Sequence, residues 1–274
     1  MTGETSSQLK RNTANLEWER FDTRTRLIRY FLILFGLLAV VASWSALDIN
    51  TEYVITAPEQ MVDLSQRMYP PDVEYAGEIV GPLIETIHIA VLSTGLAVLL
   101  AAPVAYIAAE NTTFNRATYY LGKLIISFTR SVNVIIWALI FVVIFGPGAL
   151  AGIVAVAVRS IGFVAKLLAE AIEEIDMGSV EAISATGANP LQILIYGIIP
   201  QIKPAFITIT TFRWDINVRG ATIIGFVGAG GIGTELMTRQ NSFDWSGVLT
   251  ILIAILFVVV FSEMLSAYLR KKVA

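Results

Sequence analysis

Cysteine is absent from this chain of 274 residues, and histidine occurs only once, as His88. The first absence excludes disulfide bonds, Cys-ligated zinc and thiol catalysis within the chain. The second leaves no set of histidines for a metal site or a catalytic triad. Charged residues are also scarce, at 15%, whereas 55% of residues are hydrophobic and the mean hydropathy is +0.70. A soluble domain of this length would carry more charge, so the composition indicates an integral membrane protein.

Of two nucleotide-binding patterns, one is absent and the other occurs in the wrong context. No G-x-x-x-x-G-K-[ST] sequence occurs, so the chain has no P-loop with which to hydrolyse ATP. Residues 228–233 match G-x-G-x-x-G, but they lie between two long apolar runs rather than in a βαβ unit, which argues against nucleotide binding. We expect no catalytic residue, metal or resident cofactor. Close helix packing and a flexible re-entrant turn are the expected roles of Gly228, Gly230, Gly231 and Gly233.

Long apolar runs alternate with polar segments along the chain. A helix needs about 20 apolar residues to cross a bilayer, and six runs are long enough. We predict spans at about residues 27–47, 83–109, 117–145, 149–168, 201–227 and 247–269. The predicted architecture is an all-α integral membrane protein. Its parts are an N-terminal arm (1–26), a first transmembrane helix (27–47), an acidic connector (48–82) and a five-helix core (83–272) with a polar helical loop (170–200).

The charges of the polar segments predict the orientation in the membrane. Six spans place both termini and the loop of residues 170–200 on one side, where the basic ends of the chain also fall. The connector of residues 48–82, with seven acids and one base, falls on the other side. Because cytoplasmic loops carry an excess of Lys and Arg, we predict a multi-pass protein of the cell (inner) membrane. Both termini and the loop would be cytoplasmic, and the connector external.

The loop of residues 170–200, called the finger below, has the pattern of two short helices joined at a glycine. Ser179 is a candidate N-cap, with Glu181 in the first turn, where a negative charge suits the helix dipole. Gly187 can end this helix in a left-handed conformation. Asn189 followed by Pro190 can start the next helix, as cap and first helical residue. We interpret a helix–glycine–helix segment beside a membrane as a docking element.

Charged side chains also occur inside the predicted spans. A charge at the membrane centre costs roughly 2.5–3.5 kcal/mol on the insertion scale, so such residues usually face a protein interior or a water-filled path. Four positive charges against one negative leave a surplus of three, which favours an anion. Planar guanidinium groups match tetrahedral oxyanions well. The charges that lie about ten or more residues from the nearest predicted helix end are Arg130, Arg159, Arg213, Asp215 and Arg219.

The fifth span carries most of these groups. Asp215 and Arg219 are four residues apart and can pair on one helical face, whereas Arg213 and Asn217 are four apart on another. We predict that all four, together with Arg130 and Arg159, line a substrate pathway. The alternative is that some of the arginines extend to the membrane surface or hold helices together.

Two stretches resemble those of a known transporter family. Glu181-Ala182, Gly187 and Pro200 resemble the EAA loop of ABC-importer permeases, although three consensus positions differ. Residues 213–219, running into the glycines of 228–233, closely resemble the permease subunit of phosphonate importers, including the branch that takes phosphite and related oxyanions. The resemblance covers roughly residues 66–270. The departures from the EAA consensus are Ile183, Gly197 and Ile199.

The resemblance implies a type I ABC importer permease fold and a set of partners. Two permease copies would form a homodimer around the path, surrounded by membrane lipid. Cytoplasmic ABC ATPase subunits would hydrolyse ATP, and each would receive one finger. An external solute-binding protein would deliver a phosphonate or a related phosphorus oxyanion. Nucleic acid is not an expected partner.

Three alternatives remain open from the sequence. The first is a permease of the same type for another small solute, such as an amino acid, although the charges inside the spans argue against a neutral ligand. The second is an intramembrane enzyme that acts on a lipid phosphate. It would have to work without histidine, cysteine or paired carboxylates, and it leaves the finger unexplained. The third is a secondary transporter with inverted repeats, of which the sequence gives no convincing sign.

Overall fold

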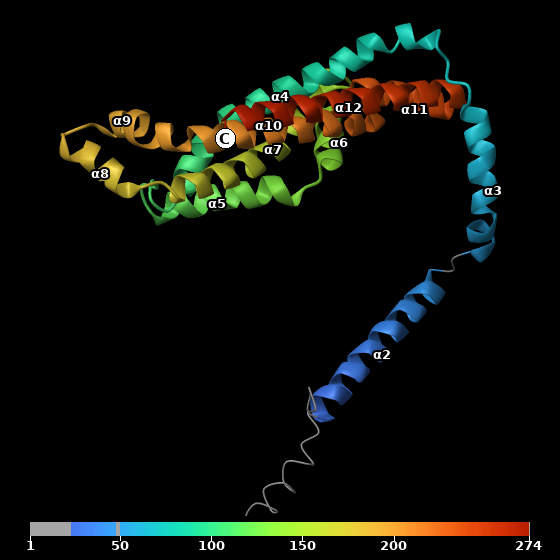
Figure 1. The fold of residues 1–274 in the computed structure, drawn as a ribbon, viewed down its shortest axis with the longest axis horizontal. Coiled ribbons are helices and arrows are strands. Elements are labelled where there is room, and N and C mark those ends of the chain that lie inside the picture. Colours follow the sequence, from blue (N-terminus) through green and yellow to red (C-terminus); the bar gives the residue numbers. More distant parts are fainter. Residues whose placement is uncertain (1–22, 48–49, 274) are drawn as a thin grey trace, which may run out of the picture. The chain divides into compact units, whose positions relative to one another are not determined.

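The chain is helical throughout the part that the structure describes. The computed structural model describes residues 23–47 and 50–273, and these ranges contain helices and no strand (Figure 1). Residues 1–22 of the predicted N-terminal arm lie outside the described residues. The long helices are α2 (Thr23–Ala46), α3 (Thr51–Met68), α4 (Val80–Ala108), α5 (Arg116–Ser131), α6 (Val134–Phe145), α7 (Ala149–Glu173), α10 (Ile199–Ile224) and α12 (Trp245–Val273). The shorter ones are η1 (Tyr75–Gly77), α8 (Met177–Ala185), α9 (Pro190–Ile193), the π-helical turn η2 (Leu194–Ile198), η3 (Gly225–Val227) and α11 (Ile232–Asn241).

Several helices have the length and composition of membrane spans. Within the described residues five segments qualify, and a sixth does if the bent pair α5–α6 is counted as one span. Contacts divide the chain into two units, residues 1–62 and 63–274. In the first unit, α2 is apolar and its described side chains are exposed, as expected of a helix in lipid. The prediction of an all-α integral membrane protein with about six spans is therefore confirmed.

Two helices lie where the sequence predicted connecting segments. α3 occupies much of the connector of residues 48–82, and α11 follows the glycines in the loop after the fifth span. The start of α3 is capped by Asn50, whose Oδ1 accepts a hydrogen bond of 2.9 Å from the backbone N of Glu52. Both helices are polar, so the apolar pattern that predicted the spans gives no sign of them.

The predicted third span, residues 117–145, is wrong as a single helix. The structure breaks it into α5 and α6, whose axes differ by 91°. Val132 is extended, and the side chain of Asn133 caps α6 by accepting a hydrogen bond of 3.0 Å from the backbone N of Ile135. Asn is a preferred N-cap, so Asn133 was the available signal for this break. Its place inside a long apolar run concealed it.

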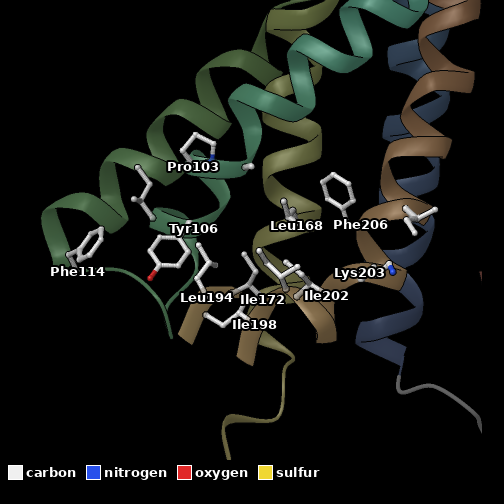
Figure 2. Close-up of a pocket in the computed structure, with 14 residues that line it drawn as sticks. Pro103, Tyr106, Phe114, Leu168, Ile172, Leu194, Ile198, Ile202, Lys203 and Phe206 are labelled. Carbon is white, nitrogen blue, oxygen red and sulfur yellow. The ribbon is translucent and has the colours of Figure 1, made fainter. Parts of the chain in front are cut away.

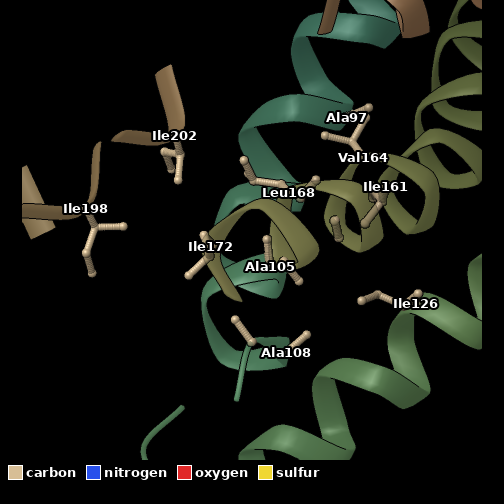
Figure 3. Close-up of a cluster of buried hydrophobic side chains, with 14 of the residues drawn as sticks. Ala97, Ala105, Ala108, Ile126, Ile161, Val164, Leu168, Ile172, Ile198 and Ile202 are labelled. Carbon is tan, nitrogen blue, oxygen red and sulfur yellow. The ribbon is translucent and has the colours of Figure 1, made fainter. Parts of the chain in front are cut away.

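α7 is the central helix of the second unit. It contacts α4, α5, α6 and α10. On its side toward α4, small side chains recur along the partner helix, and such side chains let two helices approach closely. Figure 3 shows Ala97, Ala105 and Ala108 of α4 beside Val164 and Leu168 of α7. All five side chains are buried, so the small residues of α4 form a helix-packing surface.

Candidate functional site

The finger begins at a capped helix. The cap of α8 is Asp176 rather than the predicted Ser179, because Asp176 precedes the first helical residue and accepts a 3.0 Å hydrogen bond from the backbone N of Gly178. The hydroxyl of Ser179 donates to the other carboxylate oxygen of Asp176 at 2.7 Å. These two donors lower the pKa of Asp176 below its ordinary value, with the Ser179 hydroxyl as the larger cause. The cap is therefore charged at neutral pH.

A single amide side chain joins the two ends of the finger. Oε1 of Gln201 accepts a 2.9 Å hydrogen bond from the backbone N of Asp176. Its Nε2 donates to the carbonyl oxygens of Asp176 at 3.3 Å and of Gly197 at 2.8 Å. Gln201 belongs to the first turn of α10, so this amide fixes the start of α8 against α10. The sequence analysis did not identify Gln201, because nothing in its local pattern reveals a partner 25 residues away.

The turn between α8 and α9 has the predicted form. Gly187 has a φ of +82°, a left-handed conformation that suits glycine, and its N–H donates to Ser184 O at 3.0 Å. Asn189 then caps α9, and Pro190 is the first helical residue. Oδ1 of Asn189 accepts from the backbone N of Gln192, and the Gln192 side chain accepts from the backbone N of Asn189, both at 2.9 Å. Local hydrogen bonds therefore define the shape of the finger.

The finger exposes both the residues of the EAA resemblance and a set of apolar side chains. Glu181, Ala182 and Pro200 are exposed, as is Gly187. The backbone of α8 is anchored by Val180, which is buried with Ile198 in the same apolar cluster. The exposed apolar side chains of the finger are Met177, Leu191, Ile195, Tyr196 and Ile199. A surface that exposes this many apolar side chains suits a protein partner.

The centre of the second unit contains a buried polar network. Asn217 is 1% exposed and joins three helices: its Oδ1 accepts from Ser160 of α7 at 3.0 Å, and its Nδ2 donates to Thr94 of α4 at 2.9 Å. Nε of Arg213 also donates to the Ser160 hydroxyl, at 2.8 Å. Every one of these contacts is internal. Asn217 therefore joins helices. Both Oδ1 and Nδ2 of its side chain are already bonded to other helices, so neither is left without a partner for the predicted contact with a substrate.

Asp215 and Arg219 form the predicted pair. Arg219 Nη2 lies 2.7 Å from Asp215 Oδ2 and 3.6 Å from Glu263 Oε2 of α12. The second oxygen of Asp215 accepts a 3.1 Å hydrogen bond from Ser262, also of α12. The side chain of Arg219 is 48% exposed, and that of Asp215 is buried. This cluster ties α10 to α12 and balances the charge of Arg219 with two carboxylates.

Arg213 of α10 and Arg159 of α7 form a second group of charges, in which Arg213 faces α7 rather than α12. The guanidinium carbon of Arg213 is 5.1 Å from the centroid of the Phe163 ring, and the residue is only 3% exposed. Arg159 is half-buried and close enough to Arg213 for the two charges to repel each other. Within the described residues, neither guanidinium has a carboxylate partner.

Arg130 lies at a helix end, contrary to the prediction that it is about ten or more residues from the nearest one. It is the penultimate residue of α5, next to the break before α6, because the predicted third span is two helices. A Cβ added to Gly162 of α7 would come within 2.8 Å of Arg130 Cγ, so the stem of this arginine packs on α7. Arg219 is likewise only five residues from the end of α10. The predictions for Arg159, Arg213 and Asp215 as mid-helix residues hold.

The glycine-rich segment is a closely packed turn. Gly228, Gly230 and Gly231 have φ values of +80°, +84° and +76°, which favour glycine. A Cβ on Gly233 would lie 2.9 Å from the Cα of Gly225, so η3 and α11 approach closely there. Thr86 of α4 accepts a 2.8 Å hydrogen bond from the backbone N of Ile232. Close packing is thus observed, whereas the expected flexibility of this turn stays a prediction.

The second unit also has a cavity of about 800 Å³ between α4 and α10. Figure 2 shows Pro103 and Tyr106 of α4, Leu168 and Ile172 of α7, and Phe206 of α10 around it. Its lining is apolar apart from the hydroxyl of Tyr106 and the ammonium group of Lys203. None of the predicted pathway residues lines it. A cavity of this composition suits hydrocarbon rather than a small anion, so it is not the candidate substrate site.

Sequence reasoning missed the hydroxyl residues that organise the polar centre. Thr94, Ser160 and Ser262 are single polar residues in long apolar runs, and a Ser or Thr in such a run can satisfy its own hydroxyl by bonding to the helix backbone. Their contacts with Asn217 and Asp215 arise only when four helices, α4, α7, α10 and α12, pack together. A small polar residue among apolar neighbours was the only signal available.

Comparison with known proteins gives consistent matches. The model of a family described as "Binding-protein-dependent transport system inner membrane component" matches residues 101–274. The phosphite transport system permease protein PtxC of Stutzerimonas stutzeri is 35% identical over 239 residues, which cover 87% of this chain and 86% of that protein. The phosphate-import permease protein PhnE of Mycolicibacterium smegmatis is 35% identical over 232 residues, or 85% of this chain and 43% of that longer protein.

A solved structure supports the fold. A chain of the MetNI methionine ABC transporter in an inward-facing conformation superposes with a TM-score of 0.66. The match is 24% identical and covers 74% of this chain and 99% of that chain. At this identity the likeness concerns the fold alone, and it is the fold that the EAA resemblance implied.

Proposed function

Because the chain belongs to the family of binding-protein-dependent transport system inner membrane components, as a phosphonate-type ABC importer permease, we propose that it moves a phosphonate or a related phosphorus oxyanion into the cell. It is a transporter subunit and a multi-pass membrane protein. The energy for transport would come from ATP hydrolysed by separate subunits, since the sequence has no P-loop.

The finger is the observation that carries this proposal. It lies between two long helices of the core, α7 and α10, and exposes Glu181, Ala182 and five apolar side chains. Its helix starts are capped by its own side chains, and Gln201 holds the start of α8. A rigid, partly apolar projection of this kind needs a partner surface. We assign that surface to cytoplasmic ABC ATPase subunits, with one finger docked in each.

The substrate class is supported by two independent arguments. The relatives are named for phosphite and phosphate transport, and both are phosphorus oxyanions. Inside the helices, Arg159 and Arg213 have no carboxylate partner among the described residues, which favours passage of an anion. The similar permease fold of a methionine transporter carries no argument about the ligand.

The remaining partners follow from the family description and from symmetry. A binding-protein-dependent transporter receives its ligand from an external solute-binding protein. Two copies of the chain, as a homodimer in the lipid bilayer, would enclose the path and present two fingers. The excess of Lys and Arg at the ends of the chain supports cytoplasmic termini and an external connector at residues 48–82.

Reconstitution tests the proposed function directly. The chain would be co-purified with an ATPase and a solute-binding protein encoded beside it and placed in vesicles that enclose ATP. We expect uptake of labelled phosphite or methylphosphonate that requires both ATP and the binding protein. Uptake of a neutral amino acid in place of these anions would favour the alternative of another small solute. Release of phosphate from lipid without transport would favour the intramembrane enzyme.

A further inference from the structure

Three arginines gather at one turn of α7. Arg159 belongs to α7 itself, Arg130 to α5 and Arg213 to α10. An α-helix advances about 100° per residue, so Arg159, Gly162 and Phe163 lie on one face, with Ser160 at its edge. Arg130 of α5 packs its stem on Gly162 at one side of this face. Arg213 of α10 covers Phe163 and donates to Ser160 at the other side. Arg159 projects from the angular position between them.

These three charges differ from the other arginine of the polar centre. Arg219 has two carboxylates, Asp215 and Glu263, within 3.6 Å. Among the described residues, Arg130, Arg159 and Arg213 form no ion pair, and Arg159 and Arg130 make no hydrogen bond. Arg159 and Arg213 lie close enough to repel each other, and in a low-dielectric setting such repulsion is strong. A bound anion would relieve it.

The helix break adds a second feature at the same place. Arg130 is one residue from the end of α5, and the N-terminus of α6 begins three residues after Ser131. Non-helical backbone at membrane depth is tolerated only where it is buried in protein or lines a water-filled cavity. In transporters, the N-termini of such broken helices often face anionic groups of the substrate, because the helix dipole is positive there. The break therefore places the N-terminus of α6, with its positive partial charge, next to the C-terminal turn of α5 that carries Arg130.

We propose that Arg130, Arg159 and Arg213 form the site that holds the oxyanion during passage, and that Arg219, Asp215 and Asn217 lie outside it. This inference rests on the proposed function. Arg159, half-buried, and Arg130, exposed, contact the anion directly. Arg213, almost fully buried, contributes its charge from behind them, and Ser160 and Phe163 position it.

The arrangement also defines the ligand class. Two accessible guanidinium groups can each present paired N–H donors, which suit a group with several oxygen atoms on one centre. The site is lined on the protein side by Phe163 and helix backbone rather than by acids. A compact tetrahedral oxyanion with a small apolar substituent, such as phosphite or an alkylphosphonate, meets both conditions. A zwitterionic amino acid would leave its ammonium group without a partner.

Arg159→Gln in the reconstituted transporter is the decisive variant. It removes one donor to the anion, so we expect the efficiency of phosphite uptake (kcat/KM) to fall about tenfold to hundredfold, mainly through KM. Arg159→Lys should restore part of the loss, because it keeps the charge without the paired donors. A merely structural arginine would stabilise the fold. Arg159→Gln instead relieves the repulsion between Arg159 and Arg213, so the thermal stability of the ligand-free variant should equal or exceed that of wild type.

Arg219→Gln is the matched control, since it removes the same charge from the same region. It breaks the contacts with Asp215 and Glu263, so it should lower thermal stability and leave the KM for phosphite within about twofold of wild type. If wild type takes up phosphite and Arg159→Gln has wild-type kinetics, the site assignment is overturned. It is also overturned if Arg219→Gln shows the larger rise in KM. If wild type takes up no phosphorus oxyanion, the proposed function itself fails.

Discussion

The finger and the polar centre of the core use hydrogen bonds for opposite purposes. In the finger, side chains such as Asp176 and Asn189 bond to backbone a few residues away, and the apolar side chains remain exposed. In the centre, Asn217 and Asp215 bond across helices that are distant in sequence, and apolar surface is buried around them. The finger thus draws its local shape mainly from its own caps and exposes apolar surface for a partner, whereas the centre exists only when the helices are packed.

Breaking the turn of the finger tests its half of the comparison. Gly187→Pro removes the donor to Ser184 and requires a φ near −65° where the structure has +82°. We expect ATP-driven uptake to be lost while the permease still inserts and purifies with the stability of wild type. The measurements are uptake, substrate-stimulated ATPase activity and thermal unfolding of the same preparation. Full stimulation of the ATPase in this variant would remove the finger from coupling.

Removing the central amide tests the other half. Asn217→Leu deletes the contacts with Thr94 and Ser160, at a cost of about 1–3 kcal/mol in folding free energy. The hydroxyls of Thr94 and Ser160 also bond to backbone carbonyls of their own helices, so they are not left unsatisfied. Unfolding in detergent, followed with and without a stabilising anion, measures the loss. Asn217→Asp is a control of similar size that changes the charge, and a variant as stable as wild type would show that the network is dispensable.

The amide of Gln201 connects the two regions and should give an intermediate effect. Gln201→Met keeps the length of the side chain and removes its three hydrogen bonds, each with a net value of about 0.5–1.5 kcal/mol. We expect the core to retain its stability and the number of ATP molecules hydrolysed per substrate to rise. Gln192→Met, which disturbs only the local cap of α9, is the matched control. Equal coupling ratios in the two variants would separate Gln201 from the transmission of movement.

The smallest expected effect concerns pH and the cap of α8. The pKa of Asp176 is lowered in the folded finger, mainly by Ser179, so the charged cap contributes stability above the ordinary carboxylate pKa. That contribution is lost as the pH falls through the lowered value. The protection factors of the α8 amides, corrected for the intrinsic pH dependence of exchange, should therefore fall in acid. Asp176→Asn keeps a capping oxygen and should remove this pH dependence; an unchanged pH profile would show that another group is responsible.

The sequence predicted the parts of this protein that depend on local patterns. Apolar runs of sufficient length identified the spans, and Gly187 and Asn189-Pro190 identified the turn of the finger. Patterns that compete with one another were harder to interpret. Asn133 interrupts an apolar run that continues on both sides, so the break between α5 and α6 was missed, and Arg130 was expected inside a helix rather than at its end.

The site was only partly predictable for a different reason. The charged residues were evident from their cost in a membrane, but the division between paired and unpaired arginines depends on which helices meet. Arg219 and Arg213 are six residues apart on α10, yet one faces the carboxylates near α12 and the other faces Ser160 of α7. The partners of Ser160 and Gln201 could not be predicted from local patterns because they are 57 and 25 residues away.

α10 carries both the amide that holds the finger and the residues of the polar centre. At about 1.5 Å per residue, Arg213 lies about 18 Å along the helix axis from Gln201. A tilt of about 5° at the finger would therefore displace the turn of Arg213 sideways by about 1.5 Å. Hydrogen bonds weaken steeply beyond about 3.2 Å, so such a displacement is enough to separate Arg213 from Ser160, now 2.8 Å apart. A tilt of α10 that is too small to repack the core is therefore enough to move Arg213 relative to Ser160 and to change how the site binds an anion.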